Sequence, residues 1–426
     1  MRKKRGRPPA HRGTTVELRA LYPFVVADEL GAQGCYLGKE VSGSLFCFDP
    51  WECYAIGKLT SPNMVVFGQI GRGKSAFVKS FAWRELTFGR RCWVIDPKGE
   101  YGPMAEACGT VPLRLAPGLG LRLNPLDVGS AAPAAEALRA QAPSLAHQRR
   151  ADLLGALLES SLGRPLLPQE RAAADVALLV AEERMRVPTL PAVAEIILQP
   201  APEQARLLGT DSDGLRQDGR QVALELRRLV HGDLAGMFDG ETSAGVTATG
   251  RMVVLDLSRL YSSAALGLLM VCALSWLQGS LRAGGPTKRL VVLDEAWAVL
   301  SHLATARWLQ AGFKLSRSYG VANIAVLHRM SDLKAVGQEG SEQQRLAEGL
   351  LADAETRVMF GQAPGEAEKA AGLLGLSRTE QSLLVQLPRG VALWHVGREA
   401  FLVEHELSAE ERAIADTDSA MRAGAA

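Results

Sequence analysis

Residues 68–75 have the types and spacing that bind the phosphates of a nucleotide. They read GQIGRGKS, which fits G-x-x-x-x-G-K-[ST] between an apolar run and a helical pattern. The glycines let backbone N–H groups curl around phosphate oxygens, towards which the next helix points its positive end. Lys74 would neutralise the β- and γ-phosphates, and Ser75 would ligate Mg²⁺. The alternative is an ordinary glycine-rich turn before a helix. The predicted nucleotide-binding residues are Gly68, Gln69, Ile70, Gly71, Arg72, Gly73, Lys74, Ser75 and Ala76.

A second chemical signal is the acidic pair Asp294 and Glu295, which ends the apolar run 290–293. Asp294 would hold Mg²⁺ through water, and Glu295 would polarise the water that attacks the γ-phosphate. The alternative is a helix N-cap followed by an acid in the first helical turn. Because parallel strands gather their ligands at the carboxyl edge of a sheet, we expect this pair to lie beside the glycine-rich loop.

The pattern around these motifs alternates between short apolar runs and helical periodicity. Strands are expected over 64–67, 92–95, 252–257, 290–293, 322–327 and 357–360, with short strands within 25–50 and a hairpin over 392–404. Helices are expected over 75–88, 264–281, 297–316 and 364–374. This alternation predicts an α/β fold with a mostly parallel sheet covered on both faces.

A segment rich in Ala, Leu, Glu and Arg interrupts the alternation and predicts an inserted all-helical domain of three to five helices. The expected organisation is a basic tail (1–20), a β lead-in (21–62), the first part of the α/β domain (63–130), the helical insert (131–245), the second part of the α/β domain (246–408) and a frayed C-terminal tail (409–426).

The composition is that of a folded globular protein. Of 426 residues, 47% are apolar and 22% are charged, which excludes wholesale disorder and a coiled-coil rod. The net charge of the chain is +2. Residues 1–12 carry six Lys or Arg, so the remaining residues have a net charge of −4. The six cysteines lack zinc-type spacing, which favours reduced thiols. The N-terminus lacks the apolar segment of a secretory signal, and the apolar run 264–277 is shorter than a membrane span.

Four motifs occur in a characteristic order: GQIGRGKS, DPKGEY (96–101), LRLNPLD (121–127) and LVVLDEAW (290–297). Together they resemble the ATPase domain of type IV secretion and conjugative-transfer proteins, in the HerA and FtsK branch of RecA-like motors. The resemblance extends over about residues 30–410. It implies a RecA-like P-loop NTPase fold, ATP and Mg²⁺ as cofactors, and a ring, usually a hexamer, that hydrolyses ATP to drive DNA or protein transfer or pilus assembly. It also implies partners among secretion or conjugation components and a cytoplasmic location, or one peripheral to the inner face of the cell membrane through those partners.

The sequence departs from this family at the polar sensor of the γ-phosphate. The family has Ser/Thr-Gln after the strand that follows the acidic pair, whereas this chain has Leu327 and His328. His328 could donate a hydrogen bond to phosphate; the alternative is a histidine that caps a strand end. A ring motor also needs a cation from the neighbouring subunit. We expect Arg317 in this role, with Arg357 as second candidate; the alternative for Arg317 is a charge that complements a helix dipole.

The basic tail is a candidate contact for DNA. Its cations are Arg2, Lys3, Lys4, Arg5 and Arg7, and its Arg-Gly-Arg-Pro core resembles an AT-hook. The alternative is a solvated basic tail that attracts DNA without specificity.

Three functions therefore remain open from the sequence. The first is a Mg²⁺-dependent ATPase motor for conjugation or type IV secretion. The second is a DNA-pumping translocase closer to HerA or FtsK. The third is an ATP-binding ring scaffold with little hydrolysis, which the missing sensor glutamine favours.

Overall fold

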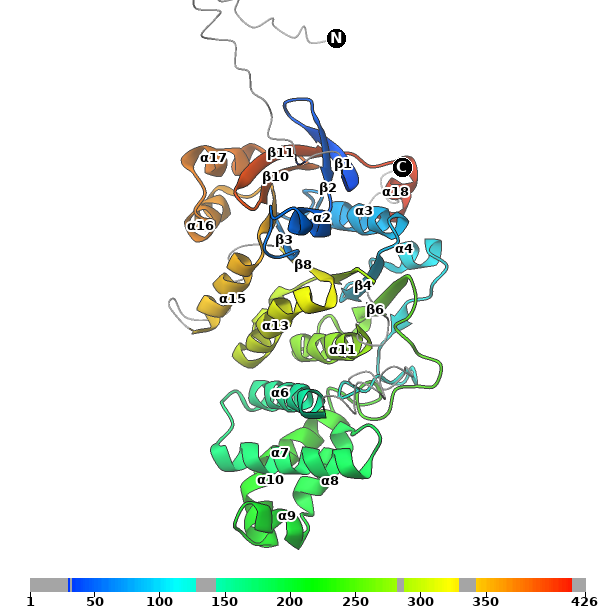
Figure 1. The fold of residues 1–426 in the computed structure, drawn as a ribbon, viewed down its shortest axis with the longest axis vertical. Coiled ribbons are helices and arrows are strands. Elements are labelled where there is room, and N and C mark those ends of the chain that lie inside the picture. Colours follow the sequence, from blue (N-terminus) through cyan, green and yellow to red (C-terminus); the bar gives the residue numbers. More distant parts are fainter. Residues whose placement is uncertain (1–29, 31–32, 128–142, 282–286, 329–341, 416–426) are drawn as a thin grey trace, which may run out of the picture.

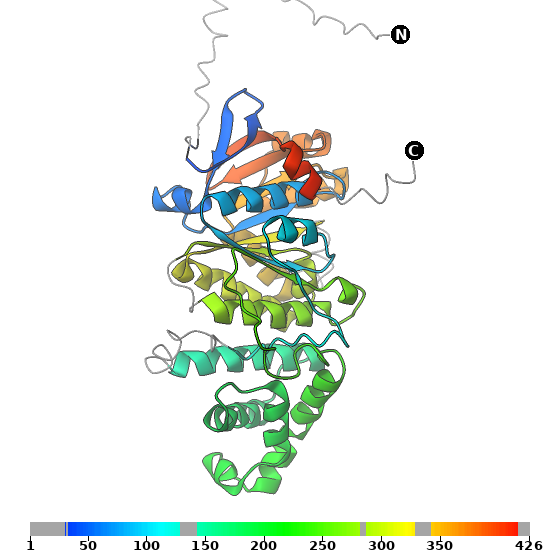
Figure 2. The same cartoon turned by 90° about the vertical axis from the view of Figure 1, so that its right-hand side faces the viewer.

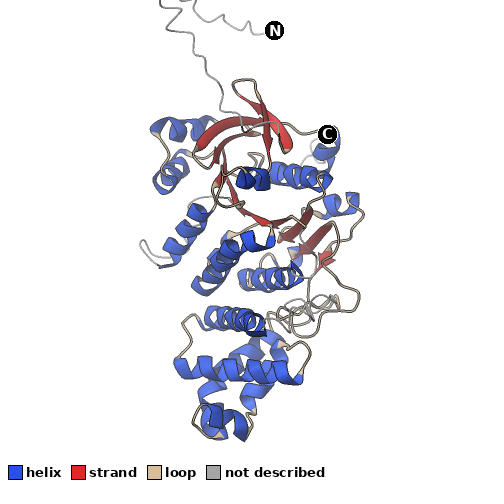
Figure 3. Ribbon diagram, viewed as in Figure 1, coloured by secondary structure: helices blue, strands red, loops and turns tan. Residues whose placement is uncertain are grey.

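The computed structural model describes residues 30, 33–127, 143–281, 287–328 and 342–415. Its described strands form one eleven-stranded sheet in the order β2-β1-β11-β10-β9-β3-β8-β7-β4-β6-β5 (Figure 3). The strands are β1 (Cys35–Glu40), β2 (Leu45–Phe48), β3 (Met64–Phe67), β4 (Arg91–Asp96), β5 (Leu113–Arg114), β6 (Met252–Asp256), β7 (Arg289–Leu293), β8 (Val321–Leu327), β9 (Thr356–Phe360), β10 (Val391–Val396) and β11 (Glu399–His405).

The strands from β9 to β5 along this order run parallel, and the remaining four pair antiparallel. Helices connect the parallel strands, as the expected α/β alternation requires. The expected lead-in supplies β1 and β2, and β1 pairs with β11, so the N-terminal hairpin and the C-terminal hairpin extend one and the same sheet. The mostly parallel α/β architecture is confirmed.

Helices cover both faces of the sheet (Figures 1 and 2). One face carries α2 (Pro50–Ala55), α3 (Lys74–Thr87), α4 (Gly102–Ala107) and α18 (Ala409–Ala415), and the other carries α11 (Leu266–Leu281) and α13 (Leu303–Leu315). Side chains of β4 alternate between the two cores: Cys92 and Val94 join one, Trp93 and Ile95 the other. This period of two is what a strand buried on both faces requires. The carboxyl edge of the sheet is thereby held rigidly between two helical layers.

The helical insert lies beyond α11 and α13, at the far end of the molecule from the N-terminal hairpin (Figure 1). It contains α6 (Pro143–Leu162), α7 (Pro168–Arg184), α8 (Leu190–Leu198), α9 (Pro202–Leu207) and α10 (Ser212–His231). Its buried side chains, such as Leu157 and Leu226, belong to the same core cluster as Leu269 of α11. The insert therefore shares a continuous apolar core with the α/β domain.

The other described helices are α15 (Glu342–Asp353), α16 (Pro364–Leu374) and α17 (Arg378–Gln386), with two short 3-10 helices, η1 (Ser258–Leu260) and η3 (Ser316–Tyr319). None of the described helices is both long and apolar enough to span a membrane. All six cysteines are unpaired thiols, as predicted. The basic tail with its AT-hook-like core lies outside the described residues.

One predicted helix is wrong in its extent. The sequence predicts a continuous helix over 297–316, but the structure divides it into α12 (Trp297–Leu300) and α13. Hydroxyl groups cause the break: Ser301 Oγ donates to the Ala298 carbonyl oxygen at 2.6 Å, and Thr305 Oγ1 donates to the Val299 carbonyl oxygen at 2.5 Å. These bonds replace the backbone pairing that a continuous helix needs.

Close packing of α11 against α12 leads to a stability prediction. A Cβ atom on Gly267 would lie 2.1 Å from the Ala298 carbonyl oxygen, whereas one on Gly155 of α6 would meet nothing within 4 Å. We expect Gly267→Ala to lower the free energy of unfolding by about 1–3 kcal/mol, because the backbones must separate. The control Gly155→Ala should raise it by up to about 1 kcal/mol. Urea unfolding of both variants measures the difference; equal effects would contradict the packing.

Candidate active site

The loop 68–75 joins β3 to α3 in a conformation that needs glycine. Gly68 and Gly73 have φ of 155° and 111°, values that other residues rarely adopt. A Cβ atom on Gly68 would also lie 2.6 Å from Cβ of Phe360, the last residue of β9. The glycines of the motif are thus fixed by backbone shape and by the neighbouring strand.

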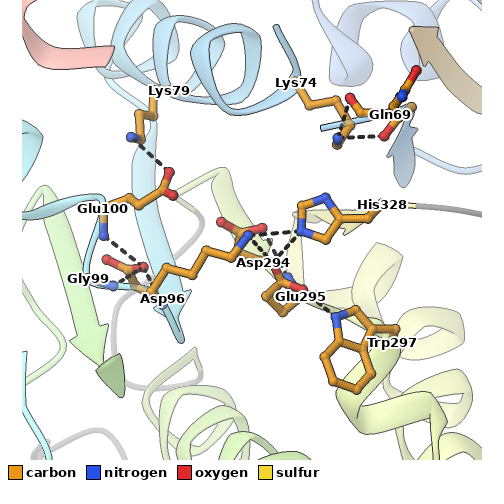
Figure 4. Close-up of polar contacts among 12 residues, drawn as sticks. Gln69, Lys74, Lys79, Asp96, Gly99, Glu100, Asp294, Glu295, Trp297 and His328 are labelled. Atoms are coloured by element: carbon orange, nitrogen blue, oxygen red, sulfur yellow. Dashed lines mark hydrogen bonds and ion pairs between the residues drawn. The ribbon is translucent and has the colours of Figure 1, made fainter. Parts of the chain in front are cut away.

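Lys74 and Ser75 occupy the first turn of α3, where backbone N–H groups have no partner within the helix. The buried Lys74 turns back over the loop, and its Nζ donates to the carbonyl oxygens of Gly68 at 2.5 Å and Gln69 at 3.1 Å (Figure 4). The Ser75 hydroxyl is half-buried and has no hydrogen bond within the described part of the chain. A cation, a free hydroxyl and a helix N-terminus therefore converge at one point, a combination that suits phosphate with Mg²⁺.

Residues from the C-terminal part of the chain hold the loop in place. The Gln69 N–H donates to the Gly361 carbonyl oxygen at 3.0 Å, and the Gly390 N–H donates to the Arg72 carbonyl oxygen at 3.0 Å. The loop is thus bonded to the segment after β9 and to the turn before β10.

The acidic pair follows β7, in a turn tied to both adjacent strands. The Asp294 N–H donates to the Ile95 carbonyl oxygen of β4 at 3.3 Å, and the Ala296 N–H donates to the Val326 carbonyl oxygen of β8 at 3.1 Å. Between them, Glu295 has a φ of 54°, which is uncommon outside glycine and carries backbone strain. Its own N–H donates to Asp294 Oδ1 at 3.0 Å. Strain at such a position is typical of functional sites.

Three side chains bind the Glu295 carboxylate (Figure 4). Lys98 forms an ion pair with Oε1, His328 shares a hydrogen bond with the same oxygen, and Trp297 donates its indole N–H to Oε2. Lys98 Nζ and His328 Nε2 are themselves 2.9 Å apart. Lys98 follows β4, Glu295 follows β7 and His328 follows β8, so the ends of three neighbouring strands form this network.

The two adjacent carboxylates differ in electrostatics. Burial, and then the charge of Glu295, raise the pKa of Asp294 to about 7. Burial alone would raise the pKa of Glu295, but the bonds from His328 and Lys98 outweigh it and lower the value to about 2. For Lys98, burial disfavours the charge, but the hydrogen bond and charge of Glu295 prevail and raise its pKa. Lys98 is therefore the cation that compensates this acidic site.

The DPKGEY loop that carries Lys98 is organised by Asp96. Asp96 Oδ1 accepts the N–H groups of Lys98, Gly99 and Glu100 at 2.9–3.2 Å, and Oδ2 accepts that of Tyr101 at 2.9 Å. Glu100 in turn forms an ion pair with the buried Lys79 of α3 at 3.4 Å. One carboxylate therefore fixes the loop backbone from which Lys98 extends.

The structure brings some of the predicted site residues together and separates others. Lys74, Ser75, Asp294, Glu295 and His328 lie at the carboxyl ends of β3, β7 and β8. His328 contacts Glu295, a partner that the sequence does not reveal.

The two arginines lie at the opposite edge of the sheet. Arg317 precedes β8 and donates to the Thr60 carbonyl oxygen at 3.1 Å, and Arg357 is the second residue of β9 and donates to the Ala354 carbonyl oxygen at 3.3 Å. In the described part of the chain, neither arginine donates a hydrogen bond to the loop 68–75.

Sequence reasoning missed the roles of Lys98 and Trp297. Both belong to quoted motifs, DPKGEY and LVVLDEAW, and the position of DPKGEY after a strand was a usable signal. Nothing in the spacing shows that Lys98 crosses from β4 to the end of β7.

The donor set fits Mg²⁺ only when phosphate is present. Within the described ranges no group of three or more His, Cys, Asp or Glu side chains could hold a metal by itself. Asp294 and Ser75 offer oxygen ligands, and Mg²⁺ prefers such oxygens together with substrate phosphates and water.

A large cavity lies elsewhere. A space of about 800 Å³ separates α6 and α7 of the insert from α11 and α13, with Trp93, Leu154, Trp308 and Tyr319 among its walls. It lies on the amino-edge side of the sheet, away from the loop, whose residues Gln69, Ile70 and Gly71 are exposed. The chemistry therefore sits on an open surface and not in this cavity.

Solved structures share this fold. VirB4 of Thermoanaerobacter pseudethanolicus is 24% identical with a TM-score of 0.71, over 90% of this chain and 99% of VirB4. The plasmid coupling protein TrwB in complex with ADP and Mg²⁺ is 15% identical with a TM-score of 0.55, over 88% of this chain and 91% of TrwB. TrwB in complex with the non-hydrolysable ATP analogue ADPNP is 15% identical with a TM-score of 0.53, over 81% of this chain and 85% of TrwB.

The sequence itself matches no protein-family model and no curated protein. The structural likeness shows the fold: the chain has the RecA-like P-loop architecture of VirB4 and TrwB, which confirms at the level of fold the resemblance that the motifs carry.

The DPKGEY loop gives a testable prediction. We expect Asp96→Asn to destabilise the loop by about 1–3 kcal/mol, because its amide group would face the Tyr101 N–H that Oδ2 now accepts. Hydrogen exchange of residues 98–101 should accelerate accordingly. The matched control is Asp256→Asn on the neighbouring strand. Among the described residues, the Asp256 carboxylate accepts the Ser258 N–H and lies 3.5 Å from Nε of Arg114. Slow exchange in the Asp96 variant would contradict the role of this carboxylate.

Proposed function

We propose that this chain is a Mg²⁺-dependent ATP hydrolase that works as a ring-forming motor in conjugative DNA transfer or type IV secretion. The observation that carries the proposal is the convergence of the P-loop, the Asp294–Glu295 pair and His328 at the ends of neighbouring parallel strands. An Asp-Glu pair beside a P-loop favours hydrolysis over nucleotide binding alone.

Each residue has a defined task in this proposal. Lys74 leaves the loop carbonyl oxygens to bind the β- and γ-phosphates, and the N–H groups of the loop and of Ala76 bind phosphate oxygens. Ser75 and Asp294 would hold Mg²⁺, which would supply positive charge to the phosphates. Glu295 orients and polarises the attacking water once an oxygen of its carboxylate is free of its present partners.

The open position of the loop supports a site completed by a second chain. Gln69 and Ile70 are exposed, and Arg317 and Arg357 lie at the other edge of the sheet. In a ring, such an edge can deliver a cation to the nucleotide of the neighbouring chain. We propose a homo-hexamer, with Arg317 as the preferred cation and Arg357 as the alternative.

The likeness to VirB4 and to the plasmid coupling protein TrwB supports conjugation or secretion as the process served. The proposed partners are other components of such a system. The proposed location is the cytoplasm or the inner face of the membrane, reached through those partners. DNA is a proposed partner through the basic tail, and a HerA- or FtsK-like DNA pump is the variant of this motor that moves DNA itself.

One observation favours a second function. Lys98, His328 and Trp297 already bind the Glu295 carboxylate, and His328 stands where the related motors have glutamine. A chain that keeps Glu295 in this arrangement with nucleotide bound would be an ATP-dependent ring scaffold with little hydrolysis.

Substitution of Lys74 tests the nucleotide site. We expect Lys74→Ala to weaken ATP binding at least about 100-fold, because the cation facing the phosphates is lost. Fluorescence titration with a labelled ATP analogue measures the affinity. The control Lys369→Ala removes a surface cation paired within α16 and should bind like the wild type. Tight binding by Lys74→Ala would remove the P-loop assignment.

Substitution of Glu295 tests hydrolysis. We expect Glu295→Gln to bind ATP normally but to lower turnover by about 10²–10⁴-fold, since the amide cannot accept the proton of water. Phosphate release is measured in parallel with binding. Near-normal turnover would exclude Glu295 as the base, and a loss of assembly in place of turnover would favour the scaffold.

The wild type discriminates between the motors in the same assay. Turnover that rises cooperatively with protein concentration supports a ring. A further increase on addition of single- or double-stranded DNA supports a DNA pump, whereas turnover indifferent to DNA supports a secretion motor.

A further inference from the structure

The Asp294–Glu295 pair poses an electrostatic problem that the fold must solve. Asp294 is 2% exposed and Glu295 is 0% exposed, and their charges lie side by side at the end of one strand. Buried carboxylates need a cation nearby, because desolvation otherwise disfavours their charge. Among the described residues, the Lys or Arg ion pair to this carboxylate pair comes from Lys98.

The proposed function assigns Mg²⁺ to Asp294, whose carboxylate neighbours the Glu295 carboxylate that Lys98 binds. Lys98 and the metal would therefore compensate the same acidic pair from adjacent carboxylates. Two cations held this close repel each other strongly, because a buried site screens their charges little.

We infer that Lys98 is an exchangeable counterion of the Asp294–Glu295 pair, which leaves Glu295 when Mg²⁺ reaches the site with its nucleotide. Lys98 is thus a positioning residue: it acts on the metal site and on Glu295 and is not itself a metal ligand. This inference rests on the proposed function and adds to it a control of metal affinity by a residue of the DPKGEY loop.

The side chain of Lys98 is placed so that it can leave. It is 27% exposed, so its ammonium group can move to water without breaking the core. Lys79, a neighbouring lysine, is 1% exposed, and its pairing with Glu100 offers no such path. Asp96 fixes the backbone N–H groups of residues 98–101, so only the side chain of Lys98 needs to move.

Glu295 keeps a support after the exchange. Trp297 binds Oε2, the oxygen that Lys98 does not contact, through a neutral indole N–H. The departure of Lys98 therefore leaves Oε1 with His328 as its partner among the described residues, while the carboxylate stays anchored at Oε2. A carboxylate that is anchored and no longer paired with a lysine can accept a hydrogen bond from water.

Loss of Lys98 should change metal affinity in opposite directions for the two kinds of role, exchange with the metal or support of the metal site. If Lys98 competes with the metal, then removal of its charge must tighten metal binding. A lysine that only supported the site would weaken metal binding when lost. One charge-assisted hydrogen bond corresponds to about a tenfold change in affinity.

The test measures metal binding directly with Mn²⁺ as a probe of the Mg²⁺ site. Loss of the electron paramagnetic resonance signal of free Mn²⁺ reports binding to the full chain, at pH 8 and saturating ADP. We expect Lys98→Met to lower the dissociation constant of Mn²⁺ about tenfold. Lys98→Arg, which keeps the charge, should stay within about twofold of the wild type. The control Lys58→Met removes a cation paired with Glu399, outside the site, and should change nothing.

Unchanged or weaker Mn²⁺ binding by Lys98→Met would overturn the inference. If that variant fails to fold, as judged by circular dichroism, Lys98→Gln removes the same charge with a polar side chain and decides the matter on the same criterion. Failure of the proposed function looks different: neither the wild type nor any variant would then bind Mn²⁺ more tightly with ADP than without it.

Discussion

Two carboxylates, forced into a buried turn at the end of β7, set the requirements for the rest of the site. Asp294 and Glu295 are held there by backbone bonds to β4 and β8, so neither can withdraw into water. Their charge must be compensated from neighbouring strands, and Lys98 does so from the end of β4. A site that is too acidic without a cation is well suited to a divalent metal that arrives with phosphate. The demand for a cation thus links the stability of this edge to its proposed chemistry.

The sheet carries different functional side chains at its two edges. Acids and the phosphate loop gather at its carboxyl edge, whereas Arg317 and Arg357 lie at its amino edge. In the proposed ring, the carboxyl edge of one copy and the amino edge of the next would together complete each active site. The helical insert packs beyond α11 and α13 and shares their core. A shift of these helices would therefore also move the insert, because packed side chains transmit it.

The sequence predicts the parts of this site that follow from local chemistry. Strand β3 and helix α16 begin and end at the predicted residues, because Gly68 follows the apolar run of β3 and α16 lies between Pro364 and Gly375. The break after Leu300 was not predictable from periodicity, since it depends on where the hydroxyls of Ser301 and Thr305 point. The partners of Glu295 were equally hidden: Lys98 and His328 lie 197 and 33 residues away along the chain and meet it only because β4 and β8 flank β7. Tertiary contacts of this kind have no signature in spacing.

The bonds that hold the phosphate loop have a consequence for how the protein matures. Residues near the start of the chain form the loop, but Gly361 and Gly390 fix it, and the first strand pairs with the last. Proteins fold progressively from their N-terminus as the ribosome synthesises them. Here the nascent chain carries the complete motif long before the residues that shape it exist. The loop would therefore reach its final shape only after residues 361–390 have been synthesised, and a shorter nascent chain would lack these supports.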